Sequence, residues 1–308
     1  MAPKRILVLC GGKFAFPSLQ QLGMENFICA VAIGKGDKNC VTLLDNESQR
    51  SGFAFASFPD KQSLSGLRAW IDSVQPDYIF SISFPFLLSE EVLAYGPDRF
   101  INFHPGPLPN YRGPMPLFEV LRYREKHTAI CVHFMNAEFD EGAIILSEQI
   151  AINPGETYGS LAVKLSERLA QVTLNMAQML QFASVIPSTE QQPHEGRYFE
   201  NPETEDTFIQ WKRMTAAQIV ALINACNPWN QGADTILTGK PVKLVSASLS
   251  ENSHNEQPGK ITAISDLALS VACINNEIID VHIVGGDHGF MTSGEFNNLK
   301  SVINQSFT

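Results

Sequence analysis

The sequence predicts an α/β protein, with a Rossmann-like, mostly parallel sheet followed by a small, OB-like β-barrel domain. In the first half, short apolar runs alternate with helical patterns, which is typical of βαβ units. Near the other end, short strand-like runs are separated by Gly, Pro and Asn, which favours a small barrel. The length of 308 residues suits two domains.

The first domain is expected over residues 1–186. Six apolar runs are predicted as its strands: Ile6–Cys10, Ile28–Ile33, Tyr78–Ser83, Phe100–Phe103, Thr128–Phe134 and Ala143–Ile150. Helices are predicted over Leu64–Val74 and over Ser89–Tyr95, where Ser89 is the expected N-cap. A long helix from about Tyr158 to Phe182 carries Leu and Met at spacings of three and four, which indicates packing against the sheet.

The segment 187–203 is predicted as a linker, because its first part is polar and contains proline. Residues 204–308 are expected to form the second domain. It begins with one helix, Ala216–Cys226. The expected strands of the barrel follow this helix: Val242–Ala247, Lys260–Ile264, Ala268–Ala272 and Ile278–Val284.

Charge and cysteine content limit the classes of function. The formal net charge is −10 and the pI about 5.2, which is the wrong sign for a protein that tracks phosphate backbones by bulk charge. The six cysteines are scattered, so a reducing compartment is expected and no metal site. The apolar run after Met1–Arg5 is only five residues long, so we expect no export signal, no membrane span and a cytoplasmic location.

The chemistry is concentrated in Ile101–Pro109, Tyr111–Gly113 and Phe139–Gly142. Asn102 and His104 are two residues apart, so in a strand they leave the same face at its carboxyl end. The Asn102 amide can donate to an oxyanion. The His104 imidazole can donate to the same oxyanion or relay a proton. Asp140 can stabilise the imidazole or take an amine proton through water, so these groups can pass an acyl group to an amine without a metal.

The order Asn-x-His, Leu-Pro, Arg-Gly, Asp-x-Gly resembles the 10-formyltetrahydrofolate-dependent formyltransferase family. The resemblance implies that Asn102, His104 and Asp140 are catalytic and that 10-formyltetrahydrofolate donates the formyl group. Ile209–Trp211 and Asn227–Trp229 resemble the C-terminal domain of the methionyl-tRNA and sugar-modifying members, so the similarity covers most of the chain.

Two departures from the tRNA-acting members bear on the acceptor. Many tRNA-acting and UDP-aminoarabinose enzymes carry His-Gly-Ser-Leu-Leu-Pro where this chain has His104–Pro109. The tRNA-acting enzymes also carry a basic insertion where Gly34–Cys40 is short and mildly basic. The expected acceptor is therefore the amine of a small molecule, such as an amino sugar nucleotide or an aminoacyl group. Methionyl-tRNA is the alternative, because the C-terminal domain is typical of that enzyme. Hydrolysis of the formyl group and a non-catalytic folate-binding protein are further alternatives.

The family's pterin pocket falls on the segment 83–88. The resemblance implies that the cofactor is bound by Phe84, Phe86, Leu87 and Leu88 together with Asp140, while packing in the core is the alternative for the apolar side chains.

Five residues are predicted to bind substrate: Gly11, Gly12, Pro107, Leu108 and Arg112. The two glycines either cradle a phosphate or form only a tight turn. Arg112 either braces the proline-rich loop or binds an anionic group. Two other polar residues are given no role in the mechanism, since Glu141 is interpreted as a solvated loop charge and His133 as a core histidine.

Overall fold

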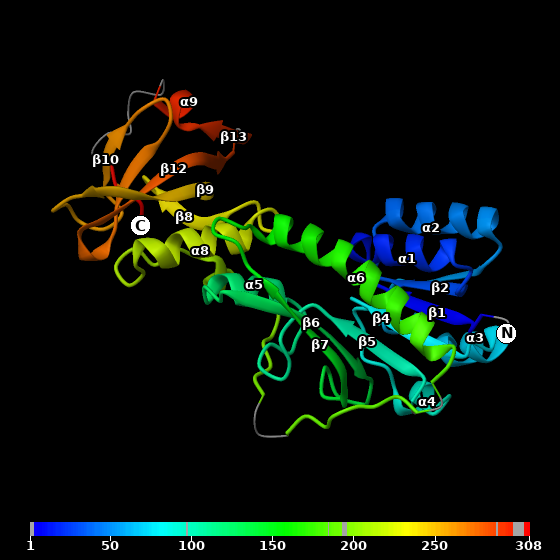
Figure 1. Ribbon diagram of the computed structural model, residues 1–308. Helices are drawn as coiled ribbons and strands as arrows, with labels where there is room; N and C mark the ends of the chain where they lie inside the picture. Colours follow the sequence, from blue (N-terminus) through cyan, green and yellow to red (C-terminus); the bar gives the residue numbers. More distant parts are fainter. Residues whose placement is uncertain (1–2, 97, 184, 193–195, 288, 298–304) are drawn as a thin grey trace. The chain divides into compact units, whose positions relative to one another are not determined.

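The computed structural model describes residues 3–96, 98–183, 185–192, 196–287, 289–297 and 305–308 (Figure 1). The chain divides into two compact units. The first unit comprises Met1–Pro116, Thr128–Ile150 and Ala162–Glu200. The second comprises Leu117–His127, Ala151–Leu161 and Asn201–Thr308. Each unit is therefore built from separate stretches of the sequence.

A seven-stranded sheet organises the first unit, in the order β3-β2-β1-β4-β5-β6-β7. Five of its strands run parallel: β3 (Ala54–Phe58), β2 (Ile28–Gly34), β1 (Ile6–Cys10), β4 (Tyr78–Ile82) and β5 (Phe100–His104). Strand β6 (His127–Phe134) is antiparallel to β5, and β7 (Ile144–Ala151) forms the edge. The predicted Rossmann-like, mostly parallel sheet is confirmed.

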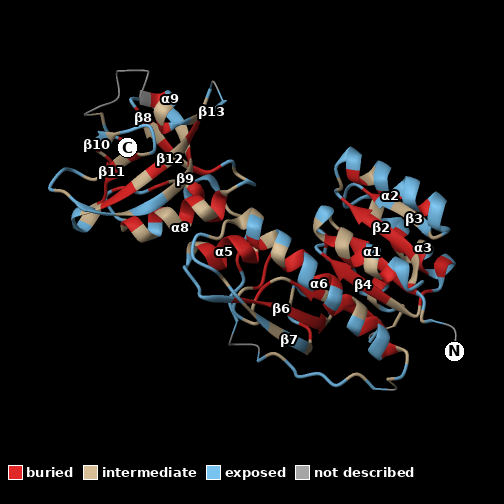
Figure 2. Ribbon diagram, turned by 45° about the horizontal axis from the view of Figure 1, so that its top comes forward, coloured by how far each residue is buried: buried red, intermediate tan, exposed pale blue. Residues whose placement is uncertain are grey.

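Helices cover this sheet: α1 (Phe16–Met24), α2 (Lys38–Ser51), α3 (Leu67–Val74), α4 (Glu90–Leu93) and α6 (Tyr158–Leu180). Figure 2 shows buried strands beside helices α1 and α2, whose outer faces are exposed. The side chain of Ser89 accepts from the Val92 amide, as its predicted capping role requires. The predicted helix over 64–74 begins as a 3-10 turn, Ser63–Gly66, before α3.

Helix α2 and strand β3 are not predicted from the sequence. Only Cys40, Leu44 and Ser48 are buried among the fourteen residues of α2, so its apolar stripe is weak. The helix is instead defined at its ends, where Asp37 caps the Cys40 amide and Gly52 adopts a left-handed conformation. Strand β3 lies at the sheet edge, with a single buried residue.

The second unit contains an antiparallel sheet, in the order β10-β11-β12-β9-β8, with β13 paired to β12. Its strands are β8 (Ala233–Leu237), β9 (Lys240–Ser253), β10 (Ile261–Ile264), β11 (Leu269–Ala272), β12 (Glu277–Gly286) and β13 (Gly289–Thr292). Its helices are α5 (Pro116–Arg122), α7 (Thr204–Thr207), α8 (Ala216–Cys226) and α9 (Ser293–Asn297). The predicted C-terminal β domain is confirmed.

The last four residues join the two end strands of this sheet. Ile236 on β8 exchanges backbone hydrogen bonds with Thr308, at 3.1 and 2.9 Å. At β10, the Ile261 amide donates to the Gln305 carbonyl at 2.9 Å. Phe307, between these contacts, stacks on Trp211 with ring centroids 5.4 Å apart. The sheet thus closes on itself through residues 305–308.

None of the described helices is long and apolar enough to cross a membrane.

Candidate active site

The three residues predicted to carry the chemistry meet on one face of β5. Asn102 and His104 leave the same face of this strand. Asp140 reaches them from the hairpin between β6 and β7. Its Oδ1 atom lies 3.3 Å from Asn102 Nδ2 and 3.4 Å from His104 Nδ1. The carboxylate is therefore shared between the amide and the imidazole.

A fourth side chain, His133, belongs to this cluster. The antiparallel register of β5 and β6 places it opposite Asn102. Its Nε2 atom lies 3.0 Å from Asn102 Nδ2 and 3.5 Å from Asp140 Oδ1. Its Nδ1 atom lies 2.7 Å from the Phe134 carbonyl oxygen, and in the tautomer that donates to this oxygen Nε2 can accept from Asn102. His133 is buried, as predicted, but it also contacts the site, and only the strand register could have indicated this.

The proline-rich loop after β5 holds both His104 and Asp140 through its backbone. His104 Nε2 donates to the Tyr111 carbonyl at 2.7 Å, and the Gly113 amide donates to Asp140 Oδ2 at 3.0 Å. Gly113 has a φ of 116°, and a Cβ there would lie 2.1 Å from the Phe199 carbonyl oxygen. The glycine of the Arg-Gly motif is therefore required by a close backbone approach.

The glycine of the Asp-x-Gly motif is also required for steric reasons. Asp140 has a φ of 57°, a left-handed conformation that a non-glycine residue rarely adopts. A Cβ at Gly142 would lie 1.7 Å from the Phe134 carbonyl oxygen. The hairpin can thus return the Asp140 carboxylate to β5 only with glycine at the second position after it.

Charge and burial oppose each other at this cluster. Burial alone would raise the pKa of Asp140, but His104, His133 and the Gly113 amide outweigh it and lower this pKa to about 2. Burial lowers the pKa of His104 below its usual value, against the opposing effects of Asp140 and the Tyr111 carbonyl. At neutral pH the Asp140 carboxylate therefore faces a neutral His104 imidazole. If the ring gains a proton, Asp140 Oδ1 and the Tyr111 carbonyl oxygen can each accept a hydrogen bond from one ring nitrogen.

The depressed pKa of Asp140 predicts a pH-dependent contribution to stability. The charged carboxylate should contribute about 2 kcal/mol above roughly pH 4, because the folded state lowers this pKa from 3.8 to about 2. The contribution is lost as the pH falls through that interval. Urea unfolding of the wild type and of Asp140→Asn should give free energies that converge as the solution is acidified from about pH 6. A constant difference over the interval would contradict this prediction.

Arg112 is buried, with 4% of its surface exposed, and its guanidinium binds other protein groups. Its Nη1 donates to Glu141 Oε1 at 2.7 Å, and its Nη2 donates to Gln191 Oε1 at 2.9 Å. Of the two interpretations of Arg112, these contacts favour the brace. Glu141 is not only a solvated loop charge, because its carboxylate pairs with this buried cation.

The predicted cofactor-binding residues divide by burial. Phe84, Phe86 and Leu88 are 9%, 3% and 2% exposed and belong to a core cluster, whereas Leu87 is 42% exposed. The rings of Phe84 and Phe86 meet edge to face at 5.6 Å. A Cβ at Gly34 would lie 2.9 Å from the Phe84 ring, so the segment packs closely on β2. The contact of these four residues with a cofactor stays a prediction.

The other predicted substrate-binding residues have structural contacts of their own. A Cβ at Gly11 would lie 1.9 Å from the Ser83 carbonyl oxygen, so this glycine permits a close backbone approach, while a Cβ at Gly12 would meet nothing within 4 Å. The Pro107 carbonyl accepts from the Tyr111 amide at 3.2 Å, and the Leu108 amide donates to Cys131 Sγ at 3.4 Å. That these four residues contact substrate stays a prediction.

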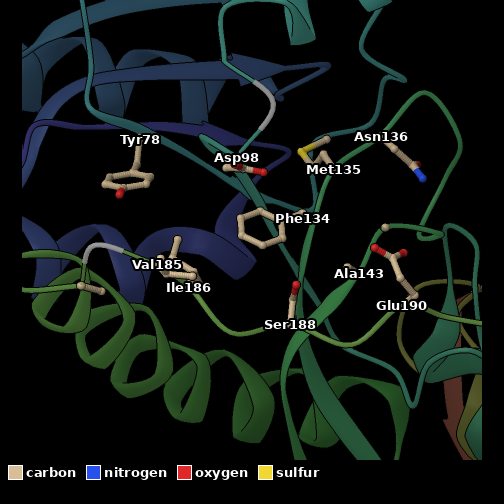
Figure 3. Close-up of a pocket in the computed structure, with 12 residues that line it drawn as sticks. Tyr78, Asp98, Phe134, Met135, Asn136, Ala143, Val185, Ile186, Ser188 and Glu190 are labelled. Carbon is tan, nitrogen blue, oxygen red and sulfur yellow. The ribbon is translucent and has the colours of Figure 1, made fainter.

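A cavity of about 540 Å³ lies beside the Asp140 hairpin and shares Phe134, Gly142 and Ala143 with it (Figure 3). Its described lining includes neither His104 nor Asp140. Its remaining lining residues are Tyr78, Asp98, Met135, Asn136, Ala183, Val185, Ile186, Ser188 and Glu190. Among the described residues, the cavity therefore contacts the hairpin but not His104 or Asp140.

Residues 5–176 match the family described as formyl transferase, and residues 202–297 match the formyl transferase C-terminal domain. This chain belongs to the formyl transferase family. The resemblance drawn from the Asn-x-His and Asp-x-Gly motifs is thereby confirmed, and so is the transferase class. The segment between the two matched ranges contains Gln191, which contacts Arg112.

Other proteins of known sequence or structure resemble this formyltransferase along most of its length. The methionyl-tRNA formyltransferase of Syntrophus aciditrophicus is 31% identical over 286 residues, 91% of this chain and 90% of that protein. The N-formyltransferase of Helicobacter canadensis, solved with folinic acid and dTDP-3-aminofucose, superposes with a TM-score of 0.70 at 16% identity, over 90% of this chain and 98% of that one. HypX of Aquifex aeolicus, solved with tetrahydrofolic acid, gives 0.67 at 17% identity, over 98% of this chain and 49% of that one. The two structures support the fold.

Proposed function

We propose that this formyltransferase moves a formyl group from 10-formyltetrahydrofolate to the primary amine of a small-molecule acceptor. The observation that carries the proposal is that Asn102 and His104 both lie within 3.4 Å of one carboxylate oxygen of Asp140. A folate donor agrees with the folate compounds bound in the H. canadensis and A. aeolicus structures.

The cluster offers the hydrogen-bond donors that acyl transfer requires. When an amine attacks the formyl carbon, the carbonyl oxygen becomes an oxyanion that requires hydrogen-bond donors. The two Asn102 amide hydrogens point to His133 and Asp140, and the contact to Asp140 is the longer at 3.3 Å. The oxyanion takes the hydrogen directed at Asp140, and His104 becomes a second donor once it has accepted the amine proton. Asp140 then loses one stabilising partner, which makes it a better proton acceptor.

Proton removal completes the proposed reaction. The attacking amine becomes positively charged as the carbon–nitrogen bond forms, and it gives up its proton toward His104 or, through water, toward Asp140. His104 is suited to this because its lowered pKa keeps the resting imidazole neutral. The tetrahedral intermediate then expels N10 of the folate, which takes up a proton, and the formylated amine is released.

Charge and loop length favour a small acceptor over tRNA. The net charge is −10, and residues 201–308 contain six Lys and Arg against eleven Asp and Glu. Strand β2 ends at Gly34 and α2 begins at Lys38, so the connection between them is too short for a basic insertion. A polyanionic acceptor would therefore gain little from bulk charge.

Methionyl-tRNA is the second candidate acceptor. The 31% identity to the S. aciditrophicus enzyme extends over 91% of this chain and so includes the C-terminal domain. This observation favours tRNA, whereas the charge distribution favours a small amine.

The acceptor is tested by a formyl-transfer assay with 10-formyltetrahydrofolate, in which the absorbance of the released folate is followed. Nucleotide-linked amino sugars, free aminoacyl compounds and methionyl-tRNA are supplied in parallel. We expect turnover with a small amine, and kcat/KM should change little with salt because few phosphate contacts form. Turnover with tRNA alone, falling steeply with salt, would overturn the small-acceptor proposal, and release of folate without any acceptor would indicate a hydrolase.

A further inference from the structure

A segment outside both matched ranges is bound to the site. We call residues 187–192 and 196–200 the strap; Figure 1 shows it as an irregular yellow-green segment passing β7. At one end, Thr189 and Ile144 exchange two backbone hydrogen bonds of 2.8 Å. At the other end, the Arg112 amide donates to the Arg197 carbonyl, and the Phe199 amide donates to the Arg112 carbonyl. The strap thus joins the Asp140 hairpin to the proline-rich loop.

Between these two attachments, the side chain of Gln191 contacts both loops. Its Nε2 donates to the carbonyls of Asp140 and Gly142, each at 2.8 Å. Its Oε1 accepts from Arg112, at 3.3 Å from Nε and 2.9 Å from Nη2. One planar amide therefore supplies two donors to the hairpin and one acceptor to the loop. Among the side chains, only Asn and Gln combine these groups, and Asn is one methylene shorter.

Arg112 closes a ring of interactions around the hairpin. Its third nitrogen, Nη1, donates to Glu141 Oε1 at 2.7 Å. Arg112 therefore binds Glu141 directly and binds the carbonyls on either side of Glu141 through Gln191. Because Arg112 is buried, the Glu141 carboxylate balances its charge and the Gln191 oxygen accepts from two of its N–H groups. The ring fixes three consecutive residues, beginning with Asp140.

Asp140 needs such support, because its φ of 57° is unfavourable for a residue with a side chain. Its backbone conformation determines where the carboxylate points. We propose that Gln191 is a positioning residue for formyl transfer, whose side-chain amide holds the Asp140 hairpin so that the carboxylate stays against His104 and Asn102. This inference rests on the proposed roles of His104 and Asp140.

Loss of the Gln191 amide has a specific expected consequence. Among the described residues, the titratable groups facing His104 are Asp140 on the hairpin and His133 and Cys131 on β6. Asp140 raises the pKa of His104 and His133 lowers it, so a displaced carboxylate leaves the imidazole with a lower pKa. Turnover should fall because the Asp140 carboxylate is misplaced, and KM should change little because the hydrogen bonds of Gln191 go to Arg112, Asp140 and Gly142.

The experiment compares Gln191→Met and Gln191→Glu with the control Gln192→Met, whose side chain is exposed. Gln191→Glu keeps an acceptor for Arg112 but has no donors for the hairpin. We expect both Gln191 variants to lower kcat by about 10- to 100-fold with KM changed less than about twofold, and the control to match the wild type. Wild-type kcat in both Gln191 variants would overturn the proposal. If Gln191→Met does not fold, Gln191→Glu provides the same test.

Repeating the Gln191→Met change in the Asp140→Asn variant distinguishes a positioning role of Gln191 from a general loss of stability. In Asp140→Asn, the Gln191→Met change should cause no further loss of kcat, because its effect passes through the carboxylate. An equal loss of kcat in both backgrounds would overturn the inference.

A measurement without substrate distinguishes this inference from the proposed function. In protein labelled with ¹⁵N-histidine, the His104 ring is titrated by NMR. Its pKa should be lower in Gln191→Met than in the wild type and unchanged in Gln192→Met. An unchanged His104 titration in Gln191→Met would refute the positioning role. If the wild type transferred formyl to no acceptor, the proposed function would fail while this titration still decided the role of Gln191.

Discussion

Replacing Asn102 or His104 with alanine is expected to lower the kcat of formyl transfer by about 10²-fold or more. The Asn102 change removes the amide that donates to the oxyanion and leaves Asp140 and His133 without their shared donor. The His104 change removes the imidazole between Asp140 and the Tyr111 carbonyl, and with it the proton acceptor. In both cases the lost interaction forms in the transition state, so kcat falls more than KM rises.

The matched control for these variants is His127→Ala. His127 is exposed and lies on β6, the strand that carries His133. Its replacement should leave kcat within about twofold of the wild type, since a surface substitution away from the site has little effect. Steady-state kinetics with the acceptor found in the parallel assay provide the measurement. Near-normal turnover in Asn102→Ala or His104→Ala would remove these residues from the mechanism.

Replacing Gly142 with alanine is expected to lower the free energy of unfolding by about 3 kcal/mol. The added Cβ would lie 1.7 Å from the Phe134 carbonyl oxygen, so the backbone of the hairpin or of β6 has to move. The same carbonyl accepts from His133 Nδ1, and the Gly142 carbonyl accepts from Gln191. The movement therefore disturbs two of the contacts that surround Asp140, and activity should fall with stability.

Gly66→Ala is the control for this prediction. A Cβ at Gly66 would meet nothing within 4 Å, so the substitution should be neutral or slightly stabilising. Urea unfolding of the two variants and the wild type gives the free energies directly. Equal stabilities of Gly142→Ala and Gly66→Ala would show that the hairpin accommodates the methyl group, contrary to the close approach of the two backbones.

From the sequence alone, four of the five parallel strands and the shared face of two catalytic candidates could be predicted, whereas the edge strand β3 could not. Strand β1 is buried along its whole length, so its continuous apolar run was a clear signal. Asn102 and His104 share a face because side chains alternate along any strand, a local property that requires no partner. Asp140 was located by the Asp-x-Gly motif of the family, because nothing in the neighbouring residues indicates that its side chain is buried beside Asn102 and His104.

How the distant parts of the site meet is evident only in the folded protein. His133 joins the cluster because β6 runs antiparallel to β5 in one register, and a shift by one residue would point its side chain to the other face. Glu141 and Gln191 acquire their roles from the buried Arg112, 29 and 79 residues away. Such contacts depend on where the chain returns, and the composition of each segment does not reveal this. For that reason a polar segment predicted as a linker can also bind the catalytic hairpin.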